Sequence, residues 1–371
     1  MNNNAAIGVS GIGLATSLGG YVDACAAFRA GLNRFQNHEH IAVMFPGEEE
    51  ANPITIAPAA VNLGGYQGVG RTIKLLINAF NDLQRNAGCE IPSESLGILL
   101  ALPDPLERGF DLEYTEEVSR ERRLTDYSDL ITKPLFDAVA PQLHNLPMQM
   151  IFGERIAFAR ILEKAKSTLV NQQLQHCLLI VADSLLDEEV LYRLQRDNEL
   201  KTSDNPVGCI PGEGAAVFWL SGPNSSGVNF TPTIAVDNNE TQLDFEEDAE
   251  IEAAIHQSWH GDKLVQQLQH VLHSHYENQY FPQVISDING SDLRATEFGL
   301  VQVAIQKFFP KSFWLEEWVP ATSFGELGAI TGPIALASAL ASIQRTYSKH
   351  REFLLPLSEA NGKRAMIHLQ F

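Results

Sequence analysis

The stretch that most constrains the fold runs from residue 182 to residue 220. Apolar side chains recur at helical spacing between Leu185 and Leu194, which predicts a short amphipathic helix followed by a polar loop. A turn with the sequence P-G-E-G at residues 211–214 then leads into an apolar run, residues 215–220, with the length of a buried strand. This order of helix, glycine turn and buried strand is typical of an α/β protein.

Earlier segments alternate in the same way. An amphipathic helix is predicted from Arg71 to Ala87, and a second from about residue 155 to Val170. Short apolar runs between and after them read as strands, and together they predict a doubly wound sheet. The predicted strands cover residues 95–102, 148–152 and 177–182, and residues 33–70, rich in proline and glycine, are expected to be a loop.

Residues 221–229, S-G-P-N-S-S-G-V-N, are small and polar and form the best candidate linker. We therefore expect an N-terminal half at residues 1–222 and a C-terminal half at residues 223–371. In the second half we expect a helix from the acidic run near Glu240 through His273, strands at 283–288, 312–318, 353–357 and 364–371, and helices at 294–309 and 332–343.

The opening segment, with Gly11-Ile12-Gly13, predicts a strand, a glycine-rich turn and a helix. It invites comparison with a dinucleotide-binding fingerprint. Thr16 stands where the third glycine of G-x-G-x-x-G is required, and no acidic residue follows at the expected distance in a strand. A nucleotide cofactor is therefore not expected.

The chain carries 46 acidic and 26 basic residues, a formal net charge of −20. Nucleic acids and anionic membranes both reward positive charge, so neither is an expected partner. The longest apolar runs are too short to cross a bilayer, and the N-terminus lacks the pattern of a signal peptide, which favours a cytoplasmic protein. The four cysteines form no C-x-x-C pair and are expected to be reduced thiols.

Three segments resemble β-ketoacyl synthases of bacterial type, condensing enzymes of the thiolase-like superfamily: the first thirty residues, about 148–220 and about 284–340. The first carries a strand, a G-x-G turn and an S-x-G before its helix; the second carries D-S, a helix and P-G-E-G-A-A before a strand. The resemblance implies an acyltransferase-family protein without a cofactor. Its fold would be thiolase-like, with two pseudo-duplicated halves in a layered αβαβα arrangement.

In that family a cysteine thiolate lies at a strand-to-helix turn, where the helix N-terminus lowers the pKa of the thiol. The corresponding turn here follows the strand at 148–152. Counting back from the Cys177 strand places the cysteine at residue 155, whereas the alanine-rich helix face places it at 151 or at Gly153. Neither register supplies a nucleophile, since the candidates are Ile151, Phe152, Gly153, Glu154 and Arg155.

Two histidines of the family polarise the thioester carbonyl. The motif I-N-A-H-G-T has its counterpart in I-N-G-S-D-L at residues 288–293, which puts Ser291 in place of the first histidine. The motif G-H-x-x-G-A-A-G has its counterpart at residues 324–332, which puts Glu326, or Gly325 in the adjacent register, in place of the second. The resemblance therefore implies that both histidines are absent.

The family's C-terminal G-F-G-G-x-N loop is replaced by L-S-E-A-N-G at residues 357–362, while Glu297 matches a glutamate that the family keeps. Because nucleophile, histidines and glycine loop are all missing, we expect no decarboxylative condensation. The sequence favours a pseudoenzyme related to fatty acid or polyketide biosynthesis, acting as a binding or scaffold protein or as a partner subunit.

Members of this fold usually dimerise through a strand of the first half, so we expect a homodimer or a heterodimer with a related ketosynthase. Acyl carrier proteins are the usual substrate carriers of the family. They are acidic, as is this chain, so the charge disfavours an acyl carrier protein as partner.

A different class of function is an active acyltransferase or hydrolase in a rebuilt pocket, using Ser291, Glu326 and Glu154. A carboxylate alone seldom activates a serine without an intervening base, which weighs against it. A third alternative is a self-associating structural protein whose acyl tunnel is filled by side chains.

Glu252, His256 and His260 recur every four residues, so a helix would place them on one face. Without a cysteine or an H-E-x-x-H motif, a hydrated acidic helix is favoured over a metal site, and no metal is predicted. Asp183 and Glu213 are expected to have structural roles.

Overall fold

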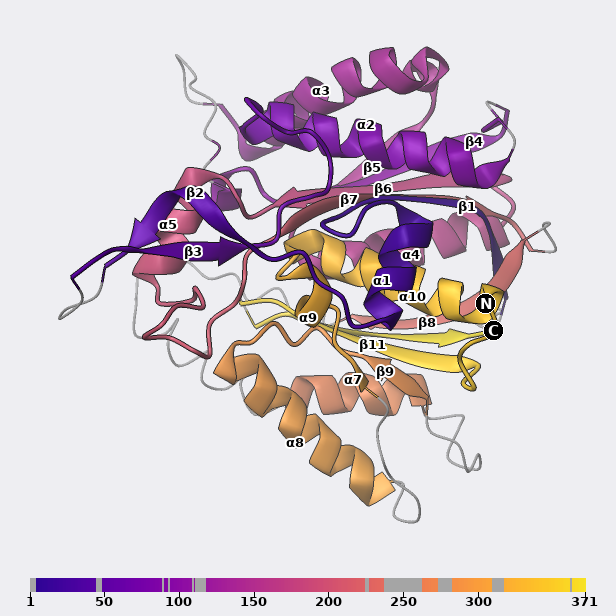
Figure 1. The fold of residues 1–371 in the computed structure, drawn as a ribbon. Helices are drawn as coiled ribbons and strands as arrows, with labels where there is room; N and C mark the ends of the chain where they lie inside the picture. The colour runs from indigo at the N-terminus through magenta and orange to yellow at the C-terminus, as the bar shows by residue number, and fades with distance from the viewer. Residues whose placement is uncertain are drawn as a thin grey trace.

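The computed structural model describes residues 5–44, 49–88, 90–92, 94–108, 110, 118–223, 227–236, 262–272, 282–308, 317–360 and 362–371. Helices and sheet alternate in five layers, and the two halves of the sheet enclose a central layer of helices (Figure 1). The outer helices are α2 (Gly68–Ala87) and α3 (Arg120–Val139) on one side and α7 (Asp262–Leu272) and α8 (Asp292–Phe308) on the other; the central ones are α1 (Tyr21–Arg29), α4 (Arg155–Val170) and α10 (Thr331–Gln344).

Ten strands form one mixed sheet in the order β10-β9-β11-β12-β8-β1-β7-β6-β4-β5. From one edge, β5, β4 and β6 are parallel, and β7 and β1 follow as antiparallel neighbours. From the other edge, β10, β9 and β11 are parallel, and β12 and β8 follow as antiparallel neighbours. The two sets therefore repeat one topology and join where β1 and β8 pair. The strands are β1 (Ile7–Ala15), β4 (Leu96–Leu102), β5 (Met148–Phe152), β6 (His176–Ser184), β7 (Glu213–Ser221), β8 (Val228–Val236), β9 (Gln283–Ile285), β10 (Glu317–Trp318), β11 (Glu352–Ser358) and β12 (Arg364–Gln370).

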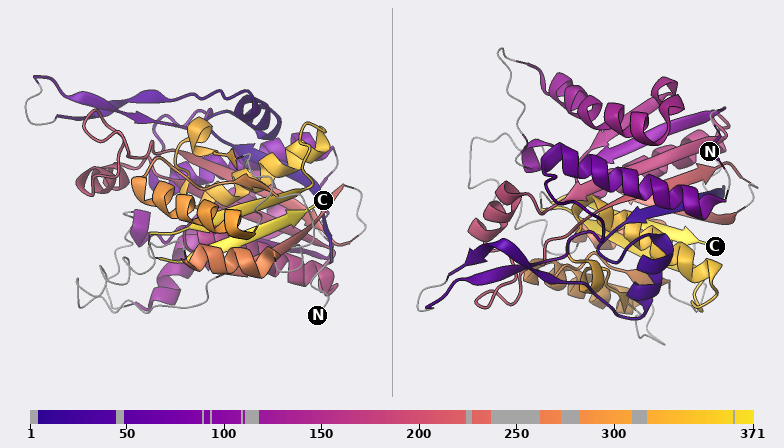
Figure 2. Two further views of the ribbon diagram at one scale, coloured as in Figure 1. Left: turned by 90° about the horizontal axis from the view of Figure 1, so that it is seen from below. Right: turned by 45° about the horizontal axis from the view of Figure 1, so that its top comes forward.

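The central strands of the first half are covered on both faces. Every residue of β4 and β7 is buried, because α2 and α3 lie over one face and the central helices over the other (Figures 1 and 2). Such strands read in sequence as continuous apolar runs rather than alternating ones. This explains why the strands around residues 95–102, 177–182 and 215–220 were predictable.

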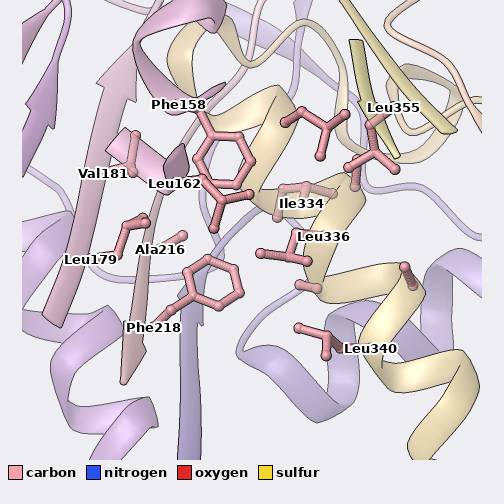
Figure 3. Close-up of a cluster of buried hydrophobic side chains, with 14 of the residues drawn as sticks. Phe158, Leu162, Leu179, Val181, Ala216, Phe218, Ile334, Leu336, Leu340 and Leu355 are labelled. Atoms are coloured by element: carbon pink, nitrogen blue, oxygen red, sulfur yellow. The ribbon is translucent and has the colours of Figure 1, made fainter. Parts of the chain in front are cut away.

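The main hydrophobic cluster fills the space between the two halves of the sheet (Figure 3). Phe158 and Leu162 of α4 face Ile334 and Leu336 of α10, and Phe218 of β7 joins them. Helix α10 is apolar all round because it is enclosed on all sides, and its first twelve residues are buried. Side chains therefore occupy the centre of this layer.

Gly11 and Gly13 lie inside β1 and not in the turn that the sequence predicted. A Cβ at Gly13 would lie 2.0 Å from the carbonyl oxygen of Ala79 and 2.3 Å from the backbone nitrogen of Leu83. Helix α2 can therefore pack directly on the strand only because this residue is glycine. The glycine pair serves helix packing.

Residues 33–70 differ from the predicted loop, because they contain β2 (Gln36–Val43) and β3 (Asn52–Ile56). These strands form an antiparallel arm that projects from the body (Figure 2). Ile41 and Ile54 of the arm share a hydrophobic cluster with Leu191 of helix α5 (Glu188–Arg196). The arm was missed because its apolar face is completed by a helix distant in sequence.

The predicted linker is also shorter than expected. Strand β7 continues to Ser221, and β8, which the sequence did not predict, begins at Val228. A division at residues 222/223 stays a prediction. Strand β9 ends at Ile285, three residues earlier than expected, and the chain then turns toward the cavity described below. Of the helix expected from near Glu240 through His273, only residues 262–272 belong to the described part of the chain, and they form α7.

Candidate functional site

Three connections line a cavity of about 550 Å³, together with the end of α5 and the loop after it. The three connections join β5 to α4, β9 to α8 and β11 to β12, and each follows the carboxyl end of a parallel strand. Sites in open α/β sheets form at such ends. Glu154, Ser291 and Glu326 all line the cavity. Gly153 directly precedes Glu154 and donates its N–H to the carbonyl oxygen of Leu102 at 3.0 Å.

Arg155 is the first residue of α4, at the turn where a nucleophile was sought. Its side chain is 2% exposed and forms an ion pair with Glu326. Its Nη1 donates to the carbonyl oxygen of Ser358 at 2.8 Å. Burial opposes the charge of Arg155, but the carboxylates of Glu326 and Asp287 outweigh it and raise the pKa of the guanidinium. A permanent cation thus occupies one of the candidate positions considered for the nucleophile.

The carboxyl group of Glu326 is held on both oxygens. Oε2 accepts from Arg155 and from Asn289 Nδ2 at 2.7 Å, and Oε1 accepts from the N–H of Gly328 at 2.8 Å. The residue is 6% exposed. Three donors thus hold this carboxylate, two on Oε2 and one on Oε1, which fits a structural acceptor.

The N-terminus of α4 is also occupied. The backbone N–H of Ile156 donates to Glu359 Oε1 at 2.8 Å, and Glu359 is 5% exposed. Helix N-terminal N–H groups could stabilise a thiolate or an oxyanion, but here a side chain of the same chain uses this one. The backbone N–H of Ser358, where the β11–β12 loop begins, donates to Asp287 Oδ2 at 2.6 Å.

Asp287 is buried beneath that loop. Burial raises the pKa of its carboxyl group to about 6, although Arg155 and the N–H of Ser358 act in the opposite direction. Arg294 Nη1 lies 3.3 Å from Asp287 Oδ2 and donates to the carbonyl oxygen of Ser358 at 3.1 Å. Both backbone groups of Ser358 are therefore bonded to buried side chains.

Ser291 is half-buried, and its backbone N–H donates to Asn289 Oδ1 at 3.0 Å. The other end of the Asn289 amide reaches Glu326, so the two predicted positions are connected through an amide group. Among the described residues that line the cavity there is no histidine. Activation of a serine hydroxyl normally relies on such a base.

Cys209 also lines the cavity, which sequence reasoning did not predict. It is 4% exposed, and burial together with the charges of Glu326 and Glu199 raises the pKa of its thiol. A thiol kept protonated is a weak nucleophile, because the thiolate is the reactive form. No sequence signal pointed to Cys209, because the loop after α5 brings it to the wall.

Asp183, at the end of β6, is a buried anchor. Arg108 binds it with both Nε, at 2.8 Å, and Nη2, at 2.9 Å, and the N–H of Ala329 donates to Oδ2 at 2.8 Å. Gly328 has a φ of 55°, and a Cβ there would lie 2.1 Å from Asp183 Oδ2. Glu154 Oε1 accepts from Arg108 Nη2 at 3.1 Å. Asp183 therefore has the structural role expected from the sequence.

Glu213 of the P-G-E-G turn is fully buried. Arg71 donates to it from Nε at 2.5 Å and from Nη2 at 2.7 Å, and Ser184 Oγ donates at 3.1 Å. The adjoining Gly212 N–H donates to the carbonyl oxygen of Glu326 at 2.8 Å. The motif that indicated the fold therefore joins the sheet to the cavity wall. A second buried pair, Glu297 with Arg364 at 2.6 Å, lies on the opposite wall.

Within the described residues, no group of three or more His, Cys, Asp or Glu side chains is placed to hold a metal ion. Glu252, His256 and His260 lie outside the described residues. No helix in the described part of the chain is long and apolar enough to cross a membrane.

By sequence, the chain matches no protein-family model and no curated protein. By structure it resembles ketosynthases and chain length factors. One match has a TM-score of 0.72 and 12% identity over 99% of each chain. It is a chain of a structure described as a type II polyketide synthase acyl carrier protein in complex with its ketosynthase bound to the hexaketide. The ishigamide ketosynthase/chain length factor matches with a TM-score of 0.65 and 13% identity over 99% of each chain. A β-ketoacyl synthase from Burkholderia phymatum STM815 matches with a TM-score of 0.65 and 10% identity, again over 99% of each chain.

At these identities the comparisons establish the fold. The layered α/β structure with its large mixed sheet is the thiolase-like fold of ketosynthases, as the sequence predicted.

Proposed function

We propose that this chain is a ketosynthase-like protein that does not catalyse decarboxylative condensation and acts as a binding or scaffold subunit. The buried ion pair between Arg155 and Glu326 is the observation that carries the proposal. Condensation requires a nucleophile that can be acylated, and a guanidinium cannot take that role.

Two further features support loss of the chemistry. The Ile156 N–H is bonded to Glu359, and the Ser358 N–H is bonded to Asp287, so neither is free to stabilise an oxyanion. One turn after Arg155, the ring of Phe158 is fully buried in the central cluster. The interior beyond the ion pair is therefore occupied by side chains.

Strand β5 supports a role in a dimer. It is an edge strand of the ten-stranded sheet, and four of its five residues are half-buried. An exposed strand edge offers unpaired backbone groups to another chain. We propose a homodimer, or a heterodimer with a related ketosynthase, and the neighbours that include a ketosynthase/chain length factor agree with such pairing. The net charge of −20 disfavours direct docking of an acidic carrier protein.

The convergence of Ser291, Glu326 and Glu154 on one cavity is the observation that favours the rival proposal, an acyltransferase or hydrolase. The engaged oxygens of Glu326 count against it as a general base. Under this rival, Ser291→Ala abolishes turnover of a short acyl thioester, whereas under our proposal the wild-type protein already shows none.

The test is incubation of the purified protein with malonyl and acyl carrier proteins, alone and mixed with an active ketosynthase. We expect no β-ketoacyl product from the protein alone. An active ketosynthase in a parallel tube confirms that the substrates are competent. Product formed by this chain alone, at a rate above buffer, would refute the proposal.

A further inference from the structure

On the side of the cavity that the C-terminal half forms, Arg364 has guanidinium N–H groups that are not all hydrogen-bonded. Arg364 is 3% exposed, and its Nε donates to Glu297 at 2.6 Å. Its Nη1 donates to the carbonyl oxygens of Glu359 and Lys363, each at 2.8 Å. Nη2 donates to no other group in the described chain, although Arg364 lines the cavity. This group is buried, charged and only partly bonded.

Arg294 repeats this arrangement beside it. Only its Nη1 is bonded, to Asp287 and to the carbonyl oxygen of Ser358, within the described chain. Because Ser358 and Glu359 are consecutive, the two guanidiniums are fixed on neighbouring carbonyl groups. Their carboxylate partners are 6% and 2% exposed, so the positive charges are balanced within the wall while further N–H groups remain for the cavity. Paired guanidinium N–H groups match the two oxygens of a carboxylate.

Helix α5 and the loop after it line another side of the cavity, where Asp197 and Glu199 outnumber the single cation Arg193. Partial burial raises the pKa of Glu199, and the neighbouring charges of Asp197 and Glu154 raise it further, with only Arg193 acting in the other direction. The pKa of the Cys209 thiol, on the same wall, is raised partly by Glu199 as well. Asp197 and Glu199 thus place two carboxyl groups on this side of the cavity.

Most of the residues that line the cavity have polar or charged side chains. Its apolar side chains are few and scattered, namely Leu185, Leu194, Val207, Leu293 and Ala360. An acyl chain would remove water from charged groups without offering them bonds, which is unfavourable. A ligand that carries charges of both signs could instead pair with the guanidiniums of Arg294 and Arg364 and with the carboxyl group of Glu199.

We propose that the cavity binds a small amino carboxylic acid, with its carboxylate between Arg294 and Arg364 and its amino group toward Glu199. This deepens the proposed binding role and rests on it, because it assigns a ligand class to the cavity that no longer supports condensation. The carboxylate takes the unbonded guanidinium N–H groups, and the ammonium group lies at the carboxyl groups of Asp197 and Glu199.

The test compares three ligands of equal chain length by isothermal titration calorimetry: 6-aminohexanoate, hexanoate and hexylamine. We expect 6-aminohexanoate to bind at least about tenfold more tightly than either single-charge analogue. Arg294→Gln should weaken binding of both carboxylates by about tenfold, and Glu199→Gln should make 6-aminohexanoate and hexanoate equivalent. Glu199→Gln replaces an exposed side chain, so we expect this variant to fold.

The matched controls are Arg351→Gln and Glu189→Gln, both at exposed positions outside the cavity, and neither should change affinity. Equal or tighter binding of hexanoate, or no heat from any of the three ligands, would overturn the inference. These readouts do not depend on turnover. A protein that condenses acyl groups would refute the proposed function while leaving the binding result intact.

Discussion

The ion pair at the start of α4 predicts strong energetic coupling between two residues 171 positions apart in sequence. Arg155→Met leaves the carboxylate of Glu326 buried without its cation, and Glu326→Gln leaves the guanidinium buried without its anion. Removing one member of a buried pair typically destabilises a protein by about 3–5 kcal/mol. Each single variant should therefore lose a free energy of unfolding within this range.

The double variant removes both charges together. The amide oxygen that Glu326→Gln introduces can still accept from the N–H of Gly328, so the remaining loss comes mainly from the hydrogen bond of Arg155 to Ser358. We expect the double variant to lose about 3 kcal/mol, no more than one single variant, because both desolvation penalties disappear. The coupling energy should then be about 3 kcal/mol or more.

The assay is urea denaturation followed by tryptophan fluorescence, with a common slope fitted to wild type and all three variants. The matched control is the exposed pair Lys133 and Asp129 on α3, whose atoms lie 2.8 Å apart with side chains 66% and 43% exposed. Its coupling should stay below about 1 kcal/mol. Additive losses at Arg155 and Glu326, or single losses below about 1 kcal/mol, would refute the reasoning.

Two further predictions concern stability. The folded-state pKa of Asp287, about 6, exceeds its unfolded value of about 3.9, so its contribution to stability is present below pH 4 and is lost as the pH rises through 6. Relative to wild type, Asp287→Asn should remove about 3 kcal/mol of pH dependence between pH 4 and 7 in urea titrations; an unchanged dependence would contradict the burial argument. Gly13→Ala should destabilise the protein by about 3 kcal/mol or more, because its Cβ would meet the α2 backbone at 2.0 Å. The control Gly299→Ala, whose Cβ meets no atom within 4 Å, should be neutral or stabilising in thermal unfolding, and equal losses in both variants would contradict the packing argument.

Much of the fold was predictable because its central strands are buried on both faces. Strands β4 and β6 are continuous apolar runs, and α2 has a clear amphipathic period, so residues near in sequence carry enough signal. Strand β8 was missed because only three of its nine residues are buried. The β2–β3 arm was missed because its apolar face is completed by α5.

The candidate site was predictable only in part. Motif comparison pointed to Ser291, Glu326 and Glu154, because each follows a recognisable strand or turn, and all three line one cavity. It treated Arg155 only as a residue without a nucleophilic atom. The ion pair joins the start of α4 to Glu326, 171 residues later in the chain. No local sequence pattern encodes such a contact.

The P-G-E-G turn keeps the structural meaning that the sequence suggested. Glu213 is bound by Arg71 and Ser184, and Gly212 is bonded to the backbone of Glu326. The turn therefore joins the sheet to the cavity wall.

The central claim is that this chain carries no acyl group during catalysis, and intact-mass spectrometry after incubation with an acyl carrier protein substrate tests it most directly. An active ketosynthase in the same tube should gain the mass of the acyl group, while this chain should keep its unmodified mass. An acyl adduct on this chain, whether at Ser291 or at Cys209, would contradict the account.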